Sequence, residues 1–230
     1  MDYSNVYKKV ASSVVNVIQV NPDKTCRDFA TGVLIGDGSK VLTCSHCVDP
    51  QYINAIYTKS TNRFLGGKII FNDPDNDIAI LDMGNVVGNA SPIKSSASLE
   101  IGNEVFTVGF PYSFSGEKTL TTGHVAAFED GLIKIDTSVN NGNSGGALFN
   151  TNGEIVGIVN AKLGSLSSFL KSVEQAKPQA AISIGGIDPV QTIQQMLREM
   201  RRNLNLGIGY AVPSDTIASI SPLIKALILR

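Results

Sequence analysis

The chain has 230 residues, of which 43% are hydrophobic, 17% are charged and none is Trp. These values are typical of one large or two small globular units, and they exclude a disordered chain. The formal net charge of −1 gives no overall attraction to nucleic acid or to an anionic membrane, so neither is expected as a partner.

Short β-rich runs separated by Gly, Asn, Asp and Pro dominate the chain. One short helix is predicted first, over Tyr3–Ser12. Strands are then predicted over Val14–Val20, Phe29–Ile35, Lys40–Cys44, Asn54–Tyr57, Gly67–Phe71 and Ile78–Asp82. A second series covers Glu104–Phe110, Thr119–Phe128, Leu132–Asp136, Ala147–Phe149, Glu154–Ala161 and Gly207–Val212. Many short strands at this spacing indicate an all-β sandwich or barrel.

Two segments interrupt the strands. The stretch Gly84–Ser98 is rich in Ser, Gly and Asn, and it is the best linker between the two series. The block Leu163–Asn205 is mostly helical in pattern, with apolar residues at helical spacing in Ser167–Ala176 and Pro189–Leu204. We therefore expect an N-terminal unit over residues 1–95 and a C-terminal unit over residues 96–230, with a helical insertion at about 163–205.

No segment approaches the ~20 apolar residues that a membrane span needs. The apolar stretch Val14–Val20 is interrupted by Asn16 and Gln19, which is unlike the apolar region of a signal peptide. A cytoplasmic location is therefore favoured, unless a leader has been removed.

The three cysteines are Cys26, Cys44 and Cys47, an odd number that argues against a complete disulfide framework. Free thiols packed as small apolar side chains are the default expectation. A Cys26–Cys47 disulfide remains an alternative. The block Cys44-Ser45-His46-Cys47 also contains zinc-ligand residue types, but it lacks a second ligand pair at a usable spacing, so no metal and no cofactor are expected.

Three polar segments carry the candidate chemistry. His46 follows a predicted strand, and Asp77 directly precedes the apolar run Ile78–Leu81. Ser144 lies in Asn141–Gly146, a loop too rich in Gly for a helix or strand. A serine hydroxyl is a weak nucleophile at neutral pH and needs a base such as imidazole to take its proton. A buried carboxylate can fix the imidazole tautomer and stabilise the imidazolium.

The oxyanion that forms when a serine attacks a carbonyl needs hydrogen-bond donors already directed at it. The backbone N–H groups of Gly142 and Ser144 can supply them, and glycine allows a backbone conformation that a side chain would hinder. Each of these signals alone is commonly structural, as we expect for the second histidine, His124. The order His, Asp, Ser with spacings of 31 and 67 residues favours a catalytic triad of His46, Asp77 and Ser144.

Several segments resemble, in order, the trypsin-fold serine peptidases and specifically their HtrA/Deg branch. They are Val41–Val48, Asp73–Leu81, Val108–Pro111, Leu120–Val125, Ile135–Leu148, Gly153–Asn160 and Gly207–Ser214. The resemblance implies two antiparallel six-stranded β-barrels, chymotrypsin-like, with the active site between them and a C-terminal helix at about 214–229. It also implies that His46 is the general base, Asp77 its orienting carboxylate and Ser144 the nucleophile, with the oxyanion hole at Gly142 and Ser144.

Substrate binding is also implied by the resemblance. The strand Ile158–Ala161 would pair with the substrate backbone as an added strand. The substrate-binding residues would be Ser138, Val139, Asn160, Ala161 and Ile208. Because no acidic residue stands at the base of this pocket, Lys and Arg are disfavoured, and small or medium aliphatic side chains are expected.

The sequence also departs from its relatives. Digestive peptidases of this fold are activated when a new N-terminal amine pairs with an Asp before the nucleophile, and Asn143 stands at that position. The resemblance covers a peptidase domain without the PDZ domain that usually follows it. The insertion Leu163–Asn205 replaces a short loop, and our hypothesis is that it acts as a lid or regulatory element.

The expected activity is that of a serine endopeptidase acting on unfolded or extended protein segments, in protein quality control or processing. Protein or peptide substrates are therefore the expected partners, and a homo-oligomer is left open. One alternative is a catalytically latent, chaperone-like or peptide-binding module that uses the same groove. Another is an esterase or other acyl transferase built on the same triad.

Overall fold

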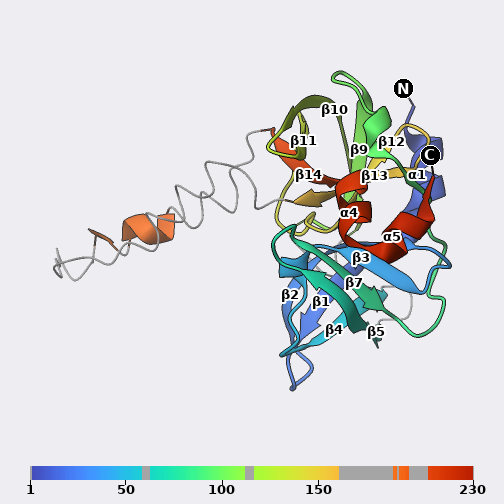
Figure 1. The fold of residues 1–230 in the computed structure, drawn as a ribbon. Coiled ribbons are helices and arrows are strands. Elements are labelled where there is room, and N and C mark those ends of the chain that lie inside the picture. The colour runs from blue at the N-terminus through green and yellow to red at the C-terminus, as the bar shows by residue number, and fades with distance from the viewer. Residues whose placement is uncertain are drawn as a thin grey trace.

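Two β-sheets make up most of the computed structural model, which describes residues 2–58, 63–111, 117–160, 189–190, 192–196 and 207–229 (Figure 1). The strands before residue 83 form one sheet, and the later strands form the other. One buried apolar cluster contains side chains from both sheets, among them Val33, Leu42, Phe106 and Phe149. The predicted all-β, chymotrypsin-like double-barrel fold is confirmed, although six strands were predicted for each barrel and the first sheet has seven.

The first sheet is antiparallel and has seven strands in the order β5-β4-β1-β2-β3-β7-β6. Its strands are β1 (Val14–Val20), β2 (Cys26–Ile35), β3 (Lys40–Thr43), β4 (Ile53–Thr58), β5 (Arg63–Gly66), β6 (Lys68–Asp73) and β7 (Ile78–Asp82). The two edge strands β5 and β6 are consecutive in the chain, and Gly67 between them donates its N–H to the carbonyl of Asn54 at 2.8 Å.

The second sheet closes on itself, because β12 pairs with both β9 and β13. Its strands are β8 (Ile93–Lys94), β9 (Glu104–Gly109), β10 (Thr119–Glu129), β11 (Leu132–Ile135), β12 (Ala147–Asn150), β13 (Ile155–Asn160), β14 (Gly209–Pro213) and β15 (Ile228–Leu229). The closed part is a six-stranded antiparallel barrel in the order β12-β9-β10-β11-β14-β13.

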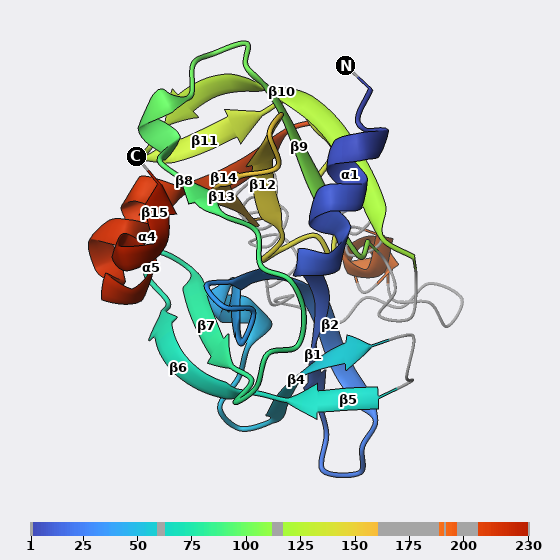
Figure 2. The ribbon, with the colours of Figure 1, turned by 90° about the vertical axis from the view of Figure 1, so that its right-hand side faces the viewer.

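The N-terminal helix packs on the second barrel, although the strand that follows it belongs to the first sheet (Figure 2). It comprises α1 (Ser4–Val10) and the 3₁₀ turn η1 (Ala11–Ser13), close to the predicted Tyr3–Ser12. The rings of Tyr3 and Phe106 meet edge to face with centroids 5.5 Å apart. Lys9 also donates to the carbonyl of Asn152 at 2.7 Å, so this helix ties the two halves together.

The prediction of one C-terminal helix over 214–229 is wrong. The structure has α4 (Ser214–Ile220), α5 (Pro222–Leu227) and then the two-residue strand β15. Pro222 has no N–H and disfavours a helical backbone at the preceding Ser221, which has φ −124° and ψ 108°. The Ser221 hydroxyl instead caps α5 by accepting from the N–H of Ile224 at 3.5 Å.

The connection between the sheets passes through the predicted linker. Val87 donates its N–H to Gly38 in the first half, whereas the carbonyl of Pro92 accepts from Ile155 in the second barrel. The strand β8 follows directly and pairs with β13 and β15. The division of the chain into two units near residue 95 stays a prediction.

The predicted helical insertion is described only in part. Residues 189–190 and 192–196 are helical, as predicted, and the rest of Leu163–Asn205 lies outside the described residues.

Within the described ranges, no helix has the length and apolar character needed to cross a bilayer.

Candidate active site

The strand register brings His46 and Asp77 together. In the antiparallel pair of β3 and β7, Thr43 lies opposite Ala79, so the residues just after β3 and just before β7 share one end of the sheet. His46 lies in the 3₁₀ turn η2 (Ser45–Cys47) that follows β3. Its ring Nδ1 is 2.6 Å from Oδ2 of Asp77, and its backbone N–H donates to Oδ1 of Asp77 at 2.9 Å.

Asp77 is held in an uncommon backbone conformation, with φ +54°. Positive φ is rare for residues other than Gly, and it persists where surrounding contacts enforce it. Here the preceding turn is closed by Asp73, whose Oδ1 accepts from the N–H groups of Asp75 and Asn76. Asn160 donates from Nδ2 to Oδ2 of Asp77 at 2.6 Å. The carboxylate is therefore fixed by contacts from both halves of the molecule.

The Asp77 carboxylate defines the state of the His46 ring. Since Asp77 accepts at Nδ1, the neutral ring carries its proton there and keeps Nε2 as the basic nitrogen. Burial alone would lower the pKa of His46, but the hydrogen bonds with Asp77 and Cys47 outweigh it and raise the pKa to about 9. His46 is thus arranged as a strong base, with Asp77 stabilising its charged form.

The loop before Ser144 contains a defined turn. The N–H of Asn143 donates to the carbonyl of Asn140 at 2.9 Å, and Gly142 has φ +96°. A four-residue turn with this bond and a positive φ at its third residue is a type II turn, which favours Gly there. A Cβ at Gly142 would lie 2.2 Å from the carbonyl oxygen of Phe110, so the site also lacks space for a side chain.

Thr31 of β2 anchors this loop to the first sheet. Its hydroxyl donates to the carbonyl of Gly142 at 2.6 Å, and its N–H donates to the carbonyl of Ser144 at 2.9 Å. Sequence reasoning missed Thr31, because nothing in its local pattern separates it from other threonines in strands. These bonds hold the carbonyl groups of the two residues whose N–H groups are predicted to form the oxyanion hole.

Ser144 is buried and lies beside the histidine turn. Only 6% of the surface of Ser144 is exposed, and the Sγ of Cys47 lies 3.7 Å from the carbonyl oxygen of Ser144. The neighbouring Asn143 is also buried, and a charged Asp in its place would carry a desolvation cost. The structure therefore brings the loops of all three predicted triad residues together, while their catalytic roles remain predictions.

The predicted substrate-binding residues have different surroundings. Val139 packs against the second barrel beside Gly209, whereas Ile208 is 47% exposed. Ser138 is half-buried, and Ala161 lies outside the described residues. Asn160 is buried, and its side-chain amide is directed at Asp77. The sequence predicted a substrate-binding role for Asn160 but not this contact.

His124 is separate from this site. It lies on β10, its side chain is half-exposed, and its Nδ1 is 3.3 Å from Oδ2 of Asp136. Both residues line a surface pocket of about 280 Å³ together with Tyr3 and Glu104. The pocket contains no member of the predicted triad.

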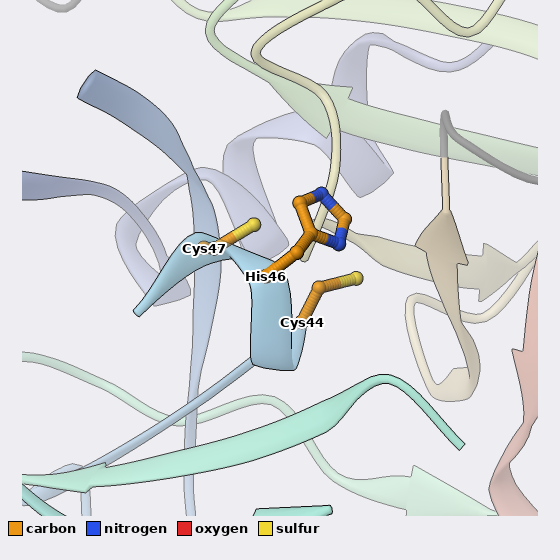
Figure 3. Close-up of side chains that lie close together, drawn as sticks. All are labelled: Cys44, His46 and Cys47. Atoms are coloured by element: carbon orange, nitrogen blue, oxygen red, sulfur yellow. The ribbon is translucent and has the colours of Figure 1, made fainter. Parts of the chain in front are cut away.

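All three cysteines are free, so the Cys26–Cys47 disulfide considered from the sequence is not present. Cys44 and Cys47 flank the histidine (Figure 3), and one donor atom of each of Cys44, His46 and Cys47 lies within 4.8 Å of the other two. Structural zinc sites use four protein ligands. Among the described residues this group offers three, and Nδ1 of His46 is already engaged by Asp77.

Comparison with known proteins agrees with this geometry. The family described as the trypsin-like peptidase domain matches residues 30–158, more than half of the chain. The chain therefore belongs to the trypsin-like peptidase domain family. The periplasmic serine endoprotease DegP of Escherichia coli strain K12 is 29% identical over 205 residues, covering 84% of this chain and 35% of DegP. The serine endoprotease DegS of Salmonella typhimurium strain 14028s is 26% identical over 226 residues, covering 90% of this chain and 60% of DegS.

Solved structures show the same fold. The HtrA-type protease AlgW with a tripeptide aligns with TM-score 0.66 and 21% identity, over 96% of this chain and 62% of the other. The serine endoprotease from Yersinia pestis aligns with TM-score 0.67 and 24% identity, over 97% and 66%. The two solved structures thus confirm the fold, and the similarity to DegP and DegS agrees with the resemblance to the HtrA/Deg branch. The chain spans about a third of the length of DegP.

Proposed function

We propose that this chain is a serine endopeptidase that cleaves extended protein segments through an acyl-enzyme formed on Ser144. The observation that carries the proposal is the double contact of Asp77 with His46, at the backbone N–H and at ring Nδ1. A carboxylate that binds only the ring could be a surface ion pair. One that also binds the backbone fixes both the position and the tautomer of the imidazole, as a general base requires.

The chemical steps follow from the two halves of the site. Nε2 of His46 takes the proton from the Ser144 hydroxyl as its oxygen attacks the peptide carbonyl, and Asp77 stabilises the imidazolium that results. The N–H groups of Gly142 and Ser144 stabilise the oxyanion. His46 then gives its proton to the leaving amine, and a water molecule, activated by the same histidine, releases the acyl group.

An extended substrate suits the end of β13. This strand pairs with β14 up to Asn160, and a substrate backbone added at this end of the strand would extend the sheet. The side chain before the cleaved bond would contact Val139 and Ile208. Since neither is charged, we propose a preference for small or medium aliphatic side chains there.

The proposal is tested by incubating the protein with unfolded casein, alongside Ser144→Ala. Cleavage by the wild-type protein alone, at bonds following Val, Ala or similar residues, is the expected result. Cleavage that is equal in both proteins would show a contaminating activity and reject Ser144 as the nucleophile. Binding of casein without cleavage by either protein would favour the alternative of a latent peptide-binding module.

A further inference from the structure

Two thiols lie on either side of the candidate catalytic histidine. Cys44 precedes the turn η2 and Cys47 ends it, and the N–H of Cys47 donates to the carbonyl of Cys44 at 3.1 Å. Such a turn keeps its first and fourth Cα atoms within about 7 Å, which overlaps the range of roughly 4.4–6.8 Å found for disulfides. Their sulfur atoms lie within 4.8 Å of each other (Figure 3). Side-chain rotation could therefore close the bond without separating the strands.

We propose that Cys44 and Cys47 are a modification site, at which peroxide forms a reversible disulfide that disables His46. Formation of the disulfide is independent of the proposed function, whereas its effect on catalysis rests on it. The third cysteine, Cys26, lies at the start of β2 and contacts the carbonyl of Asp28, so it is outside this pair.

Cys47 is the residue that we expect to react first. It retains 6% exposure, whereas Cys44 is fully buried. Burial alone would raise the pKa of Cys47, but hydrogen bonds with Cys44 and His46 outweigh it and lower the pKa. Burial raises the pKa of the Cys44 thiol. The thiolate is the reactive form of cysteine, so the more exposed thiol is also the better nucleophile.

The chemistry is balanced with hydrogen peroxide as the oxidant. The Cys47 thiolate attacks one peroxide oxygen, so an S–O bond forms, the O–O bond breaks and hydroxide leaves. Cys44 then attacks the sulfur of the Cys47 sulfenic acid, so the S–S bond forms and the S–O bond breaks. The second hydroxide leaves, and the two hydroxides take up the two thiol protons. Two thiols are oxidised to one disulfide, and peroxide is reduced to two waters. A dithiol reductant reverses the modification.

The disulfide would change contacts that organise the active site. In the reduced protein Cys44 Sγ contacts the carbonyl of Val159 at 3.4 Å, and Cys47 Sγ contacts the carbonyl of Ser144 at 3.7 Å. Val159 precedes Asn160, which holds Asp77. Closing the S–S bond requires the two sulfurs to approach each other to about 2 Å, so it would change both of these contacts beside His46. A displacement of about 1 Å in a catalytic group typically costs roughly a hundredfold in rate.

The first experiment measures the bond itself. The reduced protein is treated with hydrogen peroxide in the presence of a metal chelator, alkylated and digested, and its peptides are analysed by mass spectrometry. We expect residues 44 and 47 to be protected from alkylation and joined in one peptide whose mass is lower by two hydrogen atoms. Dithiothreitol should restore both thiols. Two freely alkylated thiols after treatment, or irreversible oxidation of each without a bond, would overturn the proposal.

The second experiment measures the effect on the site, with each protein compared with its own untreated rate. The wild-type protein and Cys26→Ser should lose roughly a hundredfold in casein cleavage and regain it with dithiothreitol. After the same peroxide treatment, Cys44→Ser and Cys47→Ser should each cleave casein at the rate of the same variant before treatment. Cys44→Ala provides a further variant if either of these two fails to fold. Full activity in protein that carries the disulfide would reject the switch. Absence of cleavage by the reduced protein would reject the proposed function, and the peptide masses would still decide whether the bond forms.

Discussion

Asn160 of β13 donates to the same oxygen of Asp77, Oδ2, that faces the ring of His46, at an N–O distance of 2.6 Å. The two residues are 83 positions apart: Asp77 directly precedes β7 of the first sheet, and Asn160 ends β13 of the second. The second barrel thus helps to orient the carboxylate that orients the histidine. Hydrogen bonds to charged groups contribute about 1.5–3 kcal/mol, which makes this contact large enough to matter for catalysis.

Asn160→Ala should lower kcat by roughly 10- to 100-fold, with little change in KM for a casein-derived peptide. The reason is that Asp77 loses a donor and its carboxylate gains freedom to turn from His46. Steady-state kinetics separate the two constants, and Asn152→Ala, an exposed asparagine in the turn after β12, is the matched control. A rise in KM at constant kcat would instead assign Asn160 to substrate binding.

Gly142→Ala should reduce kcat/KM by roughly 10²- to 10³-fold, the cost of one lost oxyanion donor. A Cβ would overlap the carbonyl of Phe110, and the turn could then not keep its positive φ. Gly102→Ala is the matched control, because Gly102 has φ +90° with open space around its Cβ position. Equal losses in the two variants would mean that backbone strain, not the oxyanion hole, causes the effect.

The pH dependence of kcat/KM should show a rising limb at unusually high pH. The base must be neutral, and a raised pKa keeps His46 protonated until the pH passes that value. Its midpoint should therefore lie above the ordinary 6.5 and toward about 9. Cys47→Ser should move the limb to lower pH, because Cys47 contributes to the raised pKa, whereas Cys26→Ser should leave it in place. A midpoint at or below 6.5 in the wild-type protein would contradict this account of the site.

Asp215→Ala should lower the free energy of unfolding by about 1–3 kcal/mol without affecting catalysis per folded molecule. The carboxylate accepts from the hydroxyls of Ser95 and Ser96 and from the N–H of Ala97, so it joins α4 to the segment after β8. Urea unfolding measures the difference, and the exposed Glu100→Ala is the control. A change no larger than that of the control would show that this junction adds nothing to stability.

Asp215 should also make the free energy of unfolding depend on pH in a defined direction. Burial alone would raise the pKa of Asp215, but the hydrogen bonds from Ser95, Ser96 and Ala97 outweigh it and hold the pKa below 3.8. Its contribution is therefore complete above pH 3.8 and is lost as the pH falls through the folded-state pKa. The difference between wild type and Asp215→Ala should shrink in acid.

Much of the fold could be predicted because the strands follow local patterns. The strand β7, for example, is an apolar run introduced by a turn with Asp73, and both features are visible in the sequence. The strands β8 and β15 have two residues each and exist only through pairing with distant strands, so no local pattern reveals them. The single C-terminal helix at about 214–229 was an expectation from the family resemblance, which does not contain the local break at Ser221-Pro222.

The candidate site shows the same limit. His46 and Asp77 stand beside the ends of predicted strands and Ser144 stands in a predicted Gly-rich loop, and their types and order indicate chemistry. The residues that hold them, Thr31 and Asn160, lie inside strands and act through contacts across the two sheets. Those contacts depend on how the sheets pack, which no local pattern contains.

The central claim, that Ser144 is an activated nucleophile, is tested most directly with a fluorophosphonate that labels reactive serines. The wild-type protein and Ser144→Ala are treated in parallel, and the site of the adduct is located by peptide mass mapping. The account predicts one adduct, at Ser144, that is absent from Ser144→Ala and much slower to form in Asp77→Asn. An adduct at another serine, or an unlabelled wild-type protein under reducing conditions, would contradict it.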